Sequence, residues 1–134
     1  RTTHYIRLLK RELGQRHNIH LYTATPDAAK VEKLAHAGLD EIRFHPPHDT
    51  WTKPDAEYGK AMRAALDAGM RAGMEIPVIP GSENSILALA GNLPDVEFIN
   101  LNELEFSESN WRELKAHGFK VREERLGAQI RGVW

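Results

Sequence analysis

Short apolar runs alternate with longer stretches of helical periodicity along the chain. The β-rich runs lie at residues 18–24, 40–46, 74–81, 96–105 and 119–121. Between the runs, apolar residues recur every three or four positions, which is typical of helices with one buried face. The runs begin about 22 to 33 residues apart, a spacing that predicts successive strand–helix units in a parallel sheet.

The first helical stretch, residues 2–13, comes before any strand. Its periodicity predicts a buried stripe formed by Tyr5, Leu8, Leu9 and Leu13. Gly14 then provides a favourable residue for the end of this helix. Because the strand that would precede this helix in a strand–helix unit is missing, we expect the chain to be a slice of a larger domain.

Right-handed crossovers of this length produce either an open doubly wound sheet or a barrel. No strand is followed by a G-x-G-x-x-G sequence, which favours the barrel over a dinucleotide-binding sheet. A complete eight-unit barrel needs about 250 residues. We therefore predict an α/β fold with an incomplete parallel (β/α) barrel over residues 1–122, followed by an irregular tail over residues 123–134.

Composition excludes several classes of partner and site but does not identify a function. Apolar residues make up 41% of the 134 residues, and the formal net charge is -1 with acidic and basic residues interspersed, so neither nucleic acid nor a membrane is an expected partner. The sequence predicts no secretory leader, and the expected location is the cytoplasm. Cysteine is absent, which excludes disulfides and thiolate-held metals within this chain.

Polar residues alternate with apolar ones inside the predicted strands. The polar positions are His20, Tyr22, Arg43, His45, Asn100 and Asn102. A purely structural barrel fills its interior with branched apolar side chains, so inward polar residues predict a ligand cavity. The alternative is that these side chains satisfy one another without any ligand.

The third predicted strand carries Pro77 and Pro80, which cannot donate hydrogen bonds to a neighbouring strand. Gly81 permits a sharp turn or a close approach of the backbone to a ligand. Ser82 and Glu83 then stand at a helix start, where free amides favour polar oxygen groups. Ordinary strand-to-helix turn chemistry explains the same residues.

His45 and His48 raise the question of a metal site, with His20 and Glu103 as further candidate ligands. The two prolines between His45 and His48 keep that segment extended, so the imidazoles need not converge. We expect no metal site from these residues. A metal-assisted barrel lyase or hydrolase using His45, His48 and strand-end carboxylates is kept as the alternative enzyme, and a non-catalytic binding module as a third hypothesis.

The stretch "EIPVIPGSE" resembles the fifth-strand motif of radical S-adenosylmethionine (radical SAM) domains, an apolar strand that ends in glycine with an acidic residue shortly after. The stretches "IHLYTAT", "DEIRFHPP" and "INLNELEFSE" resemble archaeal members loosely grouped with pyruvate formate-lyase activating enzymes. The resemblance covers residues 1–122. It implies strands three to six, with flanking helices, of a six-unit partial TIM-type barrel.

The hallmark of that family is a C-x-x-x-C-x-x-C loop that holds a [4Fe-4S] cluster, and this chain has no cysteine. The G-G-E type motif that follows strand two of the family is also missing. The resemblance therefore implies a fragment that cannot ligate the cluster and is inactive by itself.

For the intact enzyme, the resemblance implies reductive cleavage of S-adenosylmethionine at the cluster, which yields a 5′-deoxyadenosyl radical for hydrogen abstraction. The implied partners are S-adenosylmethionine, an unknown substrate and an electron donor for the cluster. No catalytic side chain is identified. The cofactor-binding candidates are Arg43, His45, Ile79, Gly81, Glu83 and Asn100, and the substrate-lining candidates are His20, Tyr22, Asn102, Glu103 and Glu105.

Overall fold

The computed structural model describes residues 1–93, 96–124 and 127–131, with side chains described as far as residue 120. The helices are α1 (Thr2–Leu13), α2 (Ala28–Ala35), α3 (Ala56–Asp67), α4 (Glu83–Asn92) and α5 (Trp111–Ala116), with a 3₁₀ turn, η1, at His48–Thr50. The strands are β1 (His20–Thr23), β2 (Glu41–Phe44), β3 (Arg71–Val78), β4 (Phe98–Glu103), β5 (Lys120–Glu124) and β6 (Gly127–Arg131). Within these described residues, none of the helices combines the length and apolarity needed to cross a membrane.

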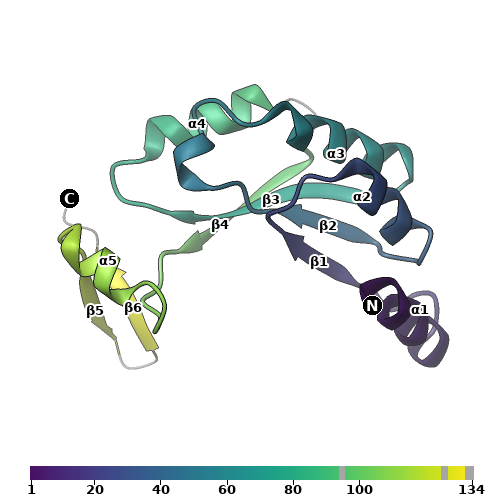
Figure 1. The fold of residues 1–134 in the computed structure, drawn as a ribbon. Helices are drawn as coiled ribbons and strands as arrows, with labels where there is room; N and C mark the ends of the chain where they lie inside the picture. Colours follow the sequence, from purple (N-terminus) through teal and green to yellow (C-terminus); the bar gives the residue numbers. More distant parts are fainter. Residues whose placement is uncertain (94–95, 125–126, 132–134) are drawn as a thin grey trace.

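Strands β1 to β4 form one parallel sheet in the order β1-β2-β3-β4. Helices α2, α3 and α4 all lie over the same face of this sheet (Figure 1). The expected α/β fold with a parallel sheet and flanking helices is confirmed. The sheet as described is open, with β1 and β4 at its edges, so closure into a barrel stays a prediction.

The hydrophobic core lies between this sheet and its helices. Ile42 and Phe44 of β2 pair with Ala72 and Met74 of β3, and all four side chains are fully buried. Helix α3 packs onto them with buried Ala61, Met62 and Ala65. Alanines let the helix approach closely, whereas the larger strand side chains fill the remaining space.

Helix α1 buries a different face from the one that its apolar stripe predicts. Tyr5, Leu9 and Leu13 are 60%, 38% and 56% exposed, whereas Ile6 and Lys10 are buried. The Lys10 ammonium donates to both oxygens of Asp40, at 2.8 and 2.6 Å, and to two backbone carbonyls. These acceptors compensate the buried ammonium, so this side of the helix can turn inward. The predicted stripe is wrong for Tyr5, Leu9 and Leu13, while Leu8 is half-buried.

The C-terminal segment also departs from prediction. β5 does not continue the parallel sheet, but pairs antiparallel with β6. Closely spaced strands pair this way because a short connection cannot make a parallel crossover. The expected irregular tail over residues 123–134 is thus wrong for Glu123 and Glu124 of β5 and for Gly127–Arg131 of β6, while its other residues lie outside the described residues. Figure 1 places α5 and this hairpin apart from the four-stranded sheet; a domain boundary at residue 122 stays a prediction.

Candidate functional site

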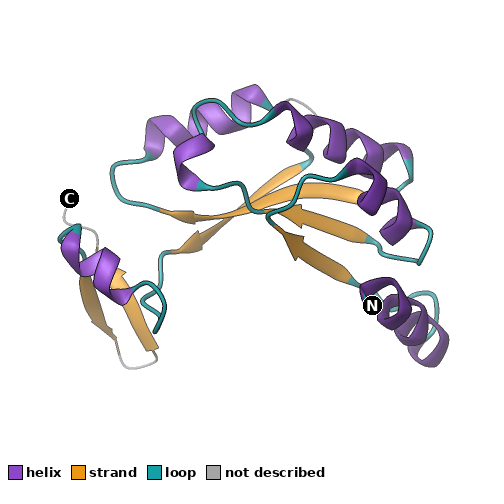
Figure 2. Cartoon of the chain, in the orientation of Figure 1, coloured by secondary structure: helices purple, strands orange, loops and turns teal. Residues whose placement is uncertain are grey.

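One face of the parallel sheet has no helix over it within the described part of the chain (Figure 2). The strand register decides which side chains share this open face. Tyr22 pairs with Arg43, Arg43 with Gly73, and Glu75 with Asn100. Because side chains alternate along each strand, His20 and Asn102 join the same face. The predicted opposition of polar and apolar positions is confirmed in β1 and β2. In β4, Asn100 and Asn102 share the polar face as predicted, but Leu101 on the opposite face is 50% exposed.

Glu75 lies at the centre of the polar side chains on this open face. Its Oε2 accepts hydrogen bonds from Arg43 Nη1 at 2.6 Å and from Asn100 Nδ2 at 3.0 Å. Its Oε1 accepts a hydrogen bond from Asn102 Nδ2 at 2.8 Å. One carboxylate from β3 thereby links β2 to β4. We refer to Tyr22, Glu41, Arg43, Glu75, Asn100 and Asn102 as the open-face network.

Arg43 connects Glu75 to the second carboxylate of the network. Its Nε donates to Glu41 Oε1 at 2.6 Å, and its Nη1 also donates to the Tyr22 hydroxyl at 3.0 Å. Arg71 Nη1 lies 3.0 Å from Glu41 Oε2. The Glu75 and Glu41 carboxylates raise the pKa of Arg43 above its usual value, so this guanidinium is a permanent cation. The two carboxylates are thus each compensated by an arginine.

The same contacts decide the ionisation of Glu75. Partial burial favours its neutral form and acts to raise its pKa, but hydrogen bonds from Asn100, Arg43 and Asn102 outweigh burial and lower the pKa to about 2. Glu75 is therefore ionised at neutral pH and can act only as an acceptor.

Gly73 and Phe98 form the apolar floor beside the network. A Cβ atom on Gly73 would lie 2.4 Å from the Phe98 ring, so only glycine leaves room for this ring. The guanidinium carbons of Arg43 and Arg71 lie 5.7 and 5.0 Å from the ring centroid. Phe98 thus interacts with both cations through its ring face.

Several predicted site residues lie apart from this network. Ile79 and Gly81 lie on the turn after β3, and Glu83 is the first residue of α4. Gly81 adopts a φ of 83°, and its backbone amide donates to Glu83 Oε1 at 3.3 Å. Glu103 pairs with Val78, which places it on the helix-covered side of β4 rather than beside Asn102. Glu105 follows the end of β4 and is exposed. The structure brings together only the candidates in β1, β2 and β4.

The histidines of the His45-Pro-Pro-His48 segment have separate partners. His45 Nδ1 lies 2.8 Å from the Glu75 carbonyl oxygen, and His48 Nε2 lies 3.1 Å from Ser82 Oγ. Among the described residues, no three histidines, aspartates or glutamates are grouped so that they could hold a metal ion. The arrangement therefore gives no support to the metal-assisted alternative.

Sequence reasoning missed Glu41 and Glu75, the two acceptors that organise the network. Glu75 stands between Met74 and Ile76, a lone carboxylate in an apolar strand, and this alternation is the signal that could have identified it. Pro77 and Pro80 instead directed the sequence-based prediction to the C-terminal end of this segment. Glu41 stands at the start of its strand, where a polar residue is common and carries no signal of its own.

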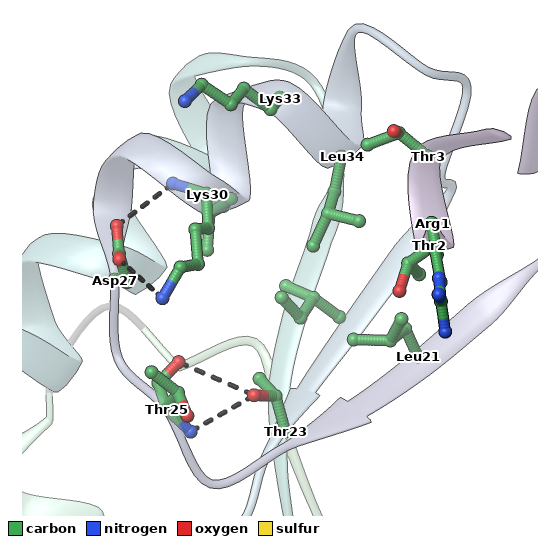
Figure 3. Close-up of a pocket in the computed structure, with 12 residues that line it drawn as sticks. Arg1, Thr2, Thr3, Leu21, Thr23, Thr25, Asp27, Lys30, Lys33 and Leu34 are labelled. Carbon is green, nitrogen blue, oxygen red and sulfur yellow. Dashed lines mark hydrogen bonds and ion pairs between the residues drawn. The ribbon is translucent and has the colours of Figure 1, made fainter.

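A separate pocket of about 320 Å³ lies between the start of α1, β1 and α2 (Figure 3). Leu21 and Leu34 line its apolar part. The Thr23 hydroxyl accepts from the Thr25 backbone amide at 3.0 Å, and Asp27 accepts from the backbone amide of Lys30 at 3.0 Å. None of the predicted site residues lines this pocket, which lies on the helix-covered side of β1.

Comparison with known proteins identifies one informative relative. The chain is 40% identical, over 132 aligned residues, to a curated Methanocaldococcus jannaschii protein named "Putative glycyl-radical enzyme activating enzyme". The alignment covers 92% of this chain but only 35% of that protein, so the chain spans about a third of its relative. No protein-family model matches the chain, and no solved structure matches it significantly. The predicted resemblance to radical SAM activating enzymes is confirmed by this relative.

Proposed function

We propose that this chain is the part of a radical SAM activating enzyme that lines the S-adenosylmethionine and substrate side of the barrel. The observation that carries the proposal is the alignment with the M. jannaschii activating enzyme, which includes the strands that bear the open-face network. That relative's name describes activation of a glycyl-radical enzyme. We infer that the substrate is likewise a protein in which a glycine is converted to its radical.

The donor set of the chain excludes the iron–sulfur cluster from these residues. Cluster irons are held by thiolates, and the chain contains no cysteine. Thiolates outside this chain would hold a [4Fe-4S] cluster in the intact enzyme, and a separate electron donor would reduce it. The cluster would then supply the one electron that splits S-adenosylmethionine into methionine and a 5′-deoxyadenosyl radical.

The open-face network suits S-adenosylmethionine better than it suits a metal. The ligand carries a carboxylate, an ammonium group, ribose hydroxyls and an adenine amine, and the network offers a cation together with amide and hydroxyl groups. In this proposal Arg43 meets an anionic oxygen, while the amide oxygens of Asn100 and Asn102 meet hydroxyl or amine donors. Ile79, Gly81 and Glu83 would then contact the adenine end from the turn after β3.

A chimeric enzyme tests the proposal directly. The aligned segment of the M. jannaschii protein is replaced by this chain, and the cluster is reconstituted without oxygen. We expect the chimera to bind S-adenosylmethionine and to release 5′-deoxyadenosine on reduction. The same chimera with Arg43→Ala is expected to keep its cluster absorbance but to lose at least about ten-fold in affinity, the cost of one charge-assisted contact.

The control variant is Lys60→Ala, which removes a surface cation that pairs with Glu57 on the same helix, α3. This variant is expected to bind S-adenosylmethionine like the unmodified chimera. A chimera that carries a full cluster yet neither binds nor cleaves S-adenosylmethionine would overturn the proposal.

A further inference from the structure

The two asparagines of β4 share one anionic partner. We propose that Glu75 is a positioning residue that turns the amide oxygens of Asn100 and Asn102 toward the ligand, so that the open face binds hydroxyl and N–H donor groups. The identity of that ligand as S-adenosylmethionine rests on the function proposed above. The orientation of the amides does not.

The orientation follows from hydrogen-bond chemistry. Asn100 Nδ2 lies 3.0 Å from Glu75 Oε2, and Asn102 Nδ2 lies 2.8 Å from Glu75 Oε1. An ionised carboxylate only accepts hydrogen bonds. Reversing either amide would set its carbonyl oxygen against a carboxylate oxygen, and the hydrogen bond would become a repulsion. Each amide oxygen is therefore held on the side away from Glu75.

The strand register makes Glu75 the common partner. Asn100 lies directly opposite Glu75 in the β3–β4 ladder, whereas Asn102 lies opposite Pro77. Pro77 has no polar side-chain atom, so the Asn102 amide reaches back to Glu75. Asn100 Nδ2 also donates a longer hydrogen bond, at 3.4 Å, to Asn102 Oδ1, and the second lone pair of that oxygen stays available to the ligand.

The charge balance keeps this arrangement constant around neutral pH. Glu75 is compensated by Arg43 at 2.6 Å, and its pKa of about 2 keeps it ionised. The ligand therefore meets two oriented carbonyl dipoles rather than an exposed negative charge. Such a surface accepts hydrogen bonds from ribose hydroxyls or amines without attracting metal cations strongly.

Glu75→Gln tests the orientation because it replaces one acceptor by a donor. Arg43 retains the remaining oxygen, so the new Nε2 faces Asn102, and the Asn102 amide turns its oxygen inward. We expect the side-chain NH2 of Asn102 to lose protection from hydrogen exchange, as measured by NMR on the ¹⁵N-labelled chain. In the chimera, we expect the affinity for S-adenosylmethionine to fall about ten-fold, because a donor now faces the ligand's donor.

A compensating variant separates positioning from simple damage. Glu75→Gln combined with Asn102→Asp conserves the charge of the pair, because the carboxylate introduced on β4 accepts from the new amide with one oxygen and presents the other to the ligand. We expect this double variant to recover affinity to within about three-fold of the unmodified chimera. The matched control is Glu57→Gln on α3, the helix that covers the opposite face of the sheet. This variant is expected to change neither the hydrogen exchange of the Asn102 NH2 nor the affinity for S-adenosylmethionine.

Two results would overturn the inference: unchanged exchange of the Asn102 NH2 in Glu75→Gln, or a double variant that binds no better than Glu75→Gln alone. If Glu75→Gln fails to fold, the double variant is compared with the unmodified protein, and loss of binding there overturns the inference equally. If the unmodified chimera does not bind S-adenosylmethionine, the proposed function fails, and the NMR result alone decides whether Glu75 positions the amides.

Discussion

The two faces of the parallel sheet carry opposite chemistry on the same strands. On the helix-covered face, Ile42, Phe44, Met74 and Ile76 are fully buried in an apolar core. On the open face, the alternate positions of the same strands hold Arg43 and Glu75 in a hydrogen-bonded network. The helix-covered face therefore stabilises the fold, whereas the open face carries polar groups that can bind a ligand.

The polar side chains of the open face are compensated by hydrogen bonds to one another. Among the described residues, no buried side-chain nitrogen or oxygen lacks a hydrogen-bond partner. A satisfied network costs little to keep, but it contributes less stability than an apolar core of similar size. Substitutions on the two faces should therefore separate stability from binding.

Phe44→Ala is expected to have the largest effect on stability. Phe44 is fully buried and meets the Tyr58 ring edge-on at a centroid distance of 5.9 Å. Its truncation should lower the free energy of unfolding by about 3 to 5 kcal/mol, measured by urea denaturation. If this loss unfolds the chain, Ile42→Val with an expected loss of about 1 kcal/mol keeps the core in the comparison. A loss for Asn100→Ala equal to that for Phe44→Ala would break the distinction between the faces.

Acid should remove the stabilisation that ionised Glu75 gives to the open face. The folded pKa of Glu75, about 2, lies below its ordinary value of 4.5, so the unfolded chain takes up the proton first as the pH falls. The stabilisation from Glu75 is therefore present above about pH 4.5 and is lost as the pH falls toward 2. The difference in unfolding free energy between the unmodified chain and Glu75→Gln should shrink by about 2 to 3 kcal/mol between pH 6 and pH 2. A difference that stays constant over this range would show that Glu75 has no depressed pKa.

Gly73→Ala is expected to have an intermediate effect that reaches the open face. The new methyl group collides with the Phe98 ring and should cost about 1 to 3 kcal/mol in unfolding free energy. Phe98→Leu in the same chain removes the rigid ring and should recover part of this loss. If Gly73→Ala alone proves neutral, the close approach of Phe98 to the β3 backbone is wrong.

Asn100→Ala should have the smallest effect on stability and a selective effect on binding. The variant loses one hydrogen bond to the ionised Glu75 carboxylate, which Arg43 and Asn102 still hold, so the unfolding free energy should fall by about 1.5 kcal/mol, the low end for a hydrogen bond to a charged group. In the chimera, the affinity for S-adenosylmethionine should fall about five-fold by calorimetry, since one acceptor is removed. Unchanged affinity together with a large loss of stability would assign Asn100 to the fold rather than to the site.

The alternation in β1, β2 and β4 was predictable because it depends only on local geometry. Successive strand side chains point to opposite faces, so Ile99 and Asn100 had to separate whatever their neighbours were. Helix α1 shows the limit of such patterns. The apolar stripe of Tyr5, Leu8, Leu9 and Leu13 predicted burial, but Lys10 on another side of the helix pairs with Asp40, 30 positions along the chain, and that side turned inward.

The sequence by itself determined the order of the strands and helices of the parallel sheet, the alternation of polar and apolar side chains along its strands, and the resemblance to a radical SAM domain. Only the tertiary structure decided which polar groups meet. Glu75 binds Asn100 and Asn102 because the β3–β4 register sets residues about 25 positions apart side by side. That register depends on how the helices between the strands pack, a property of the whole core that no local pattern of residues contains.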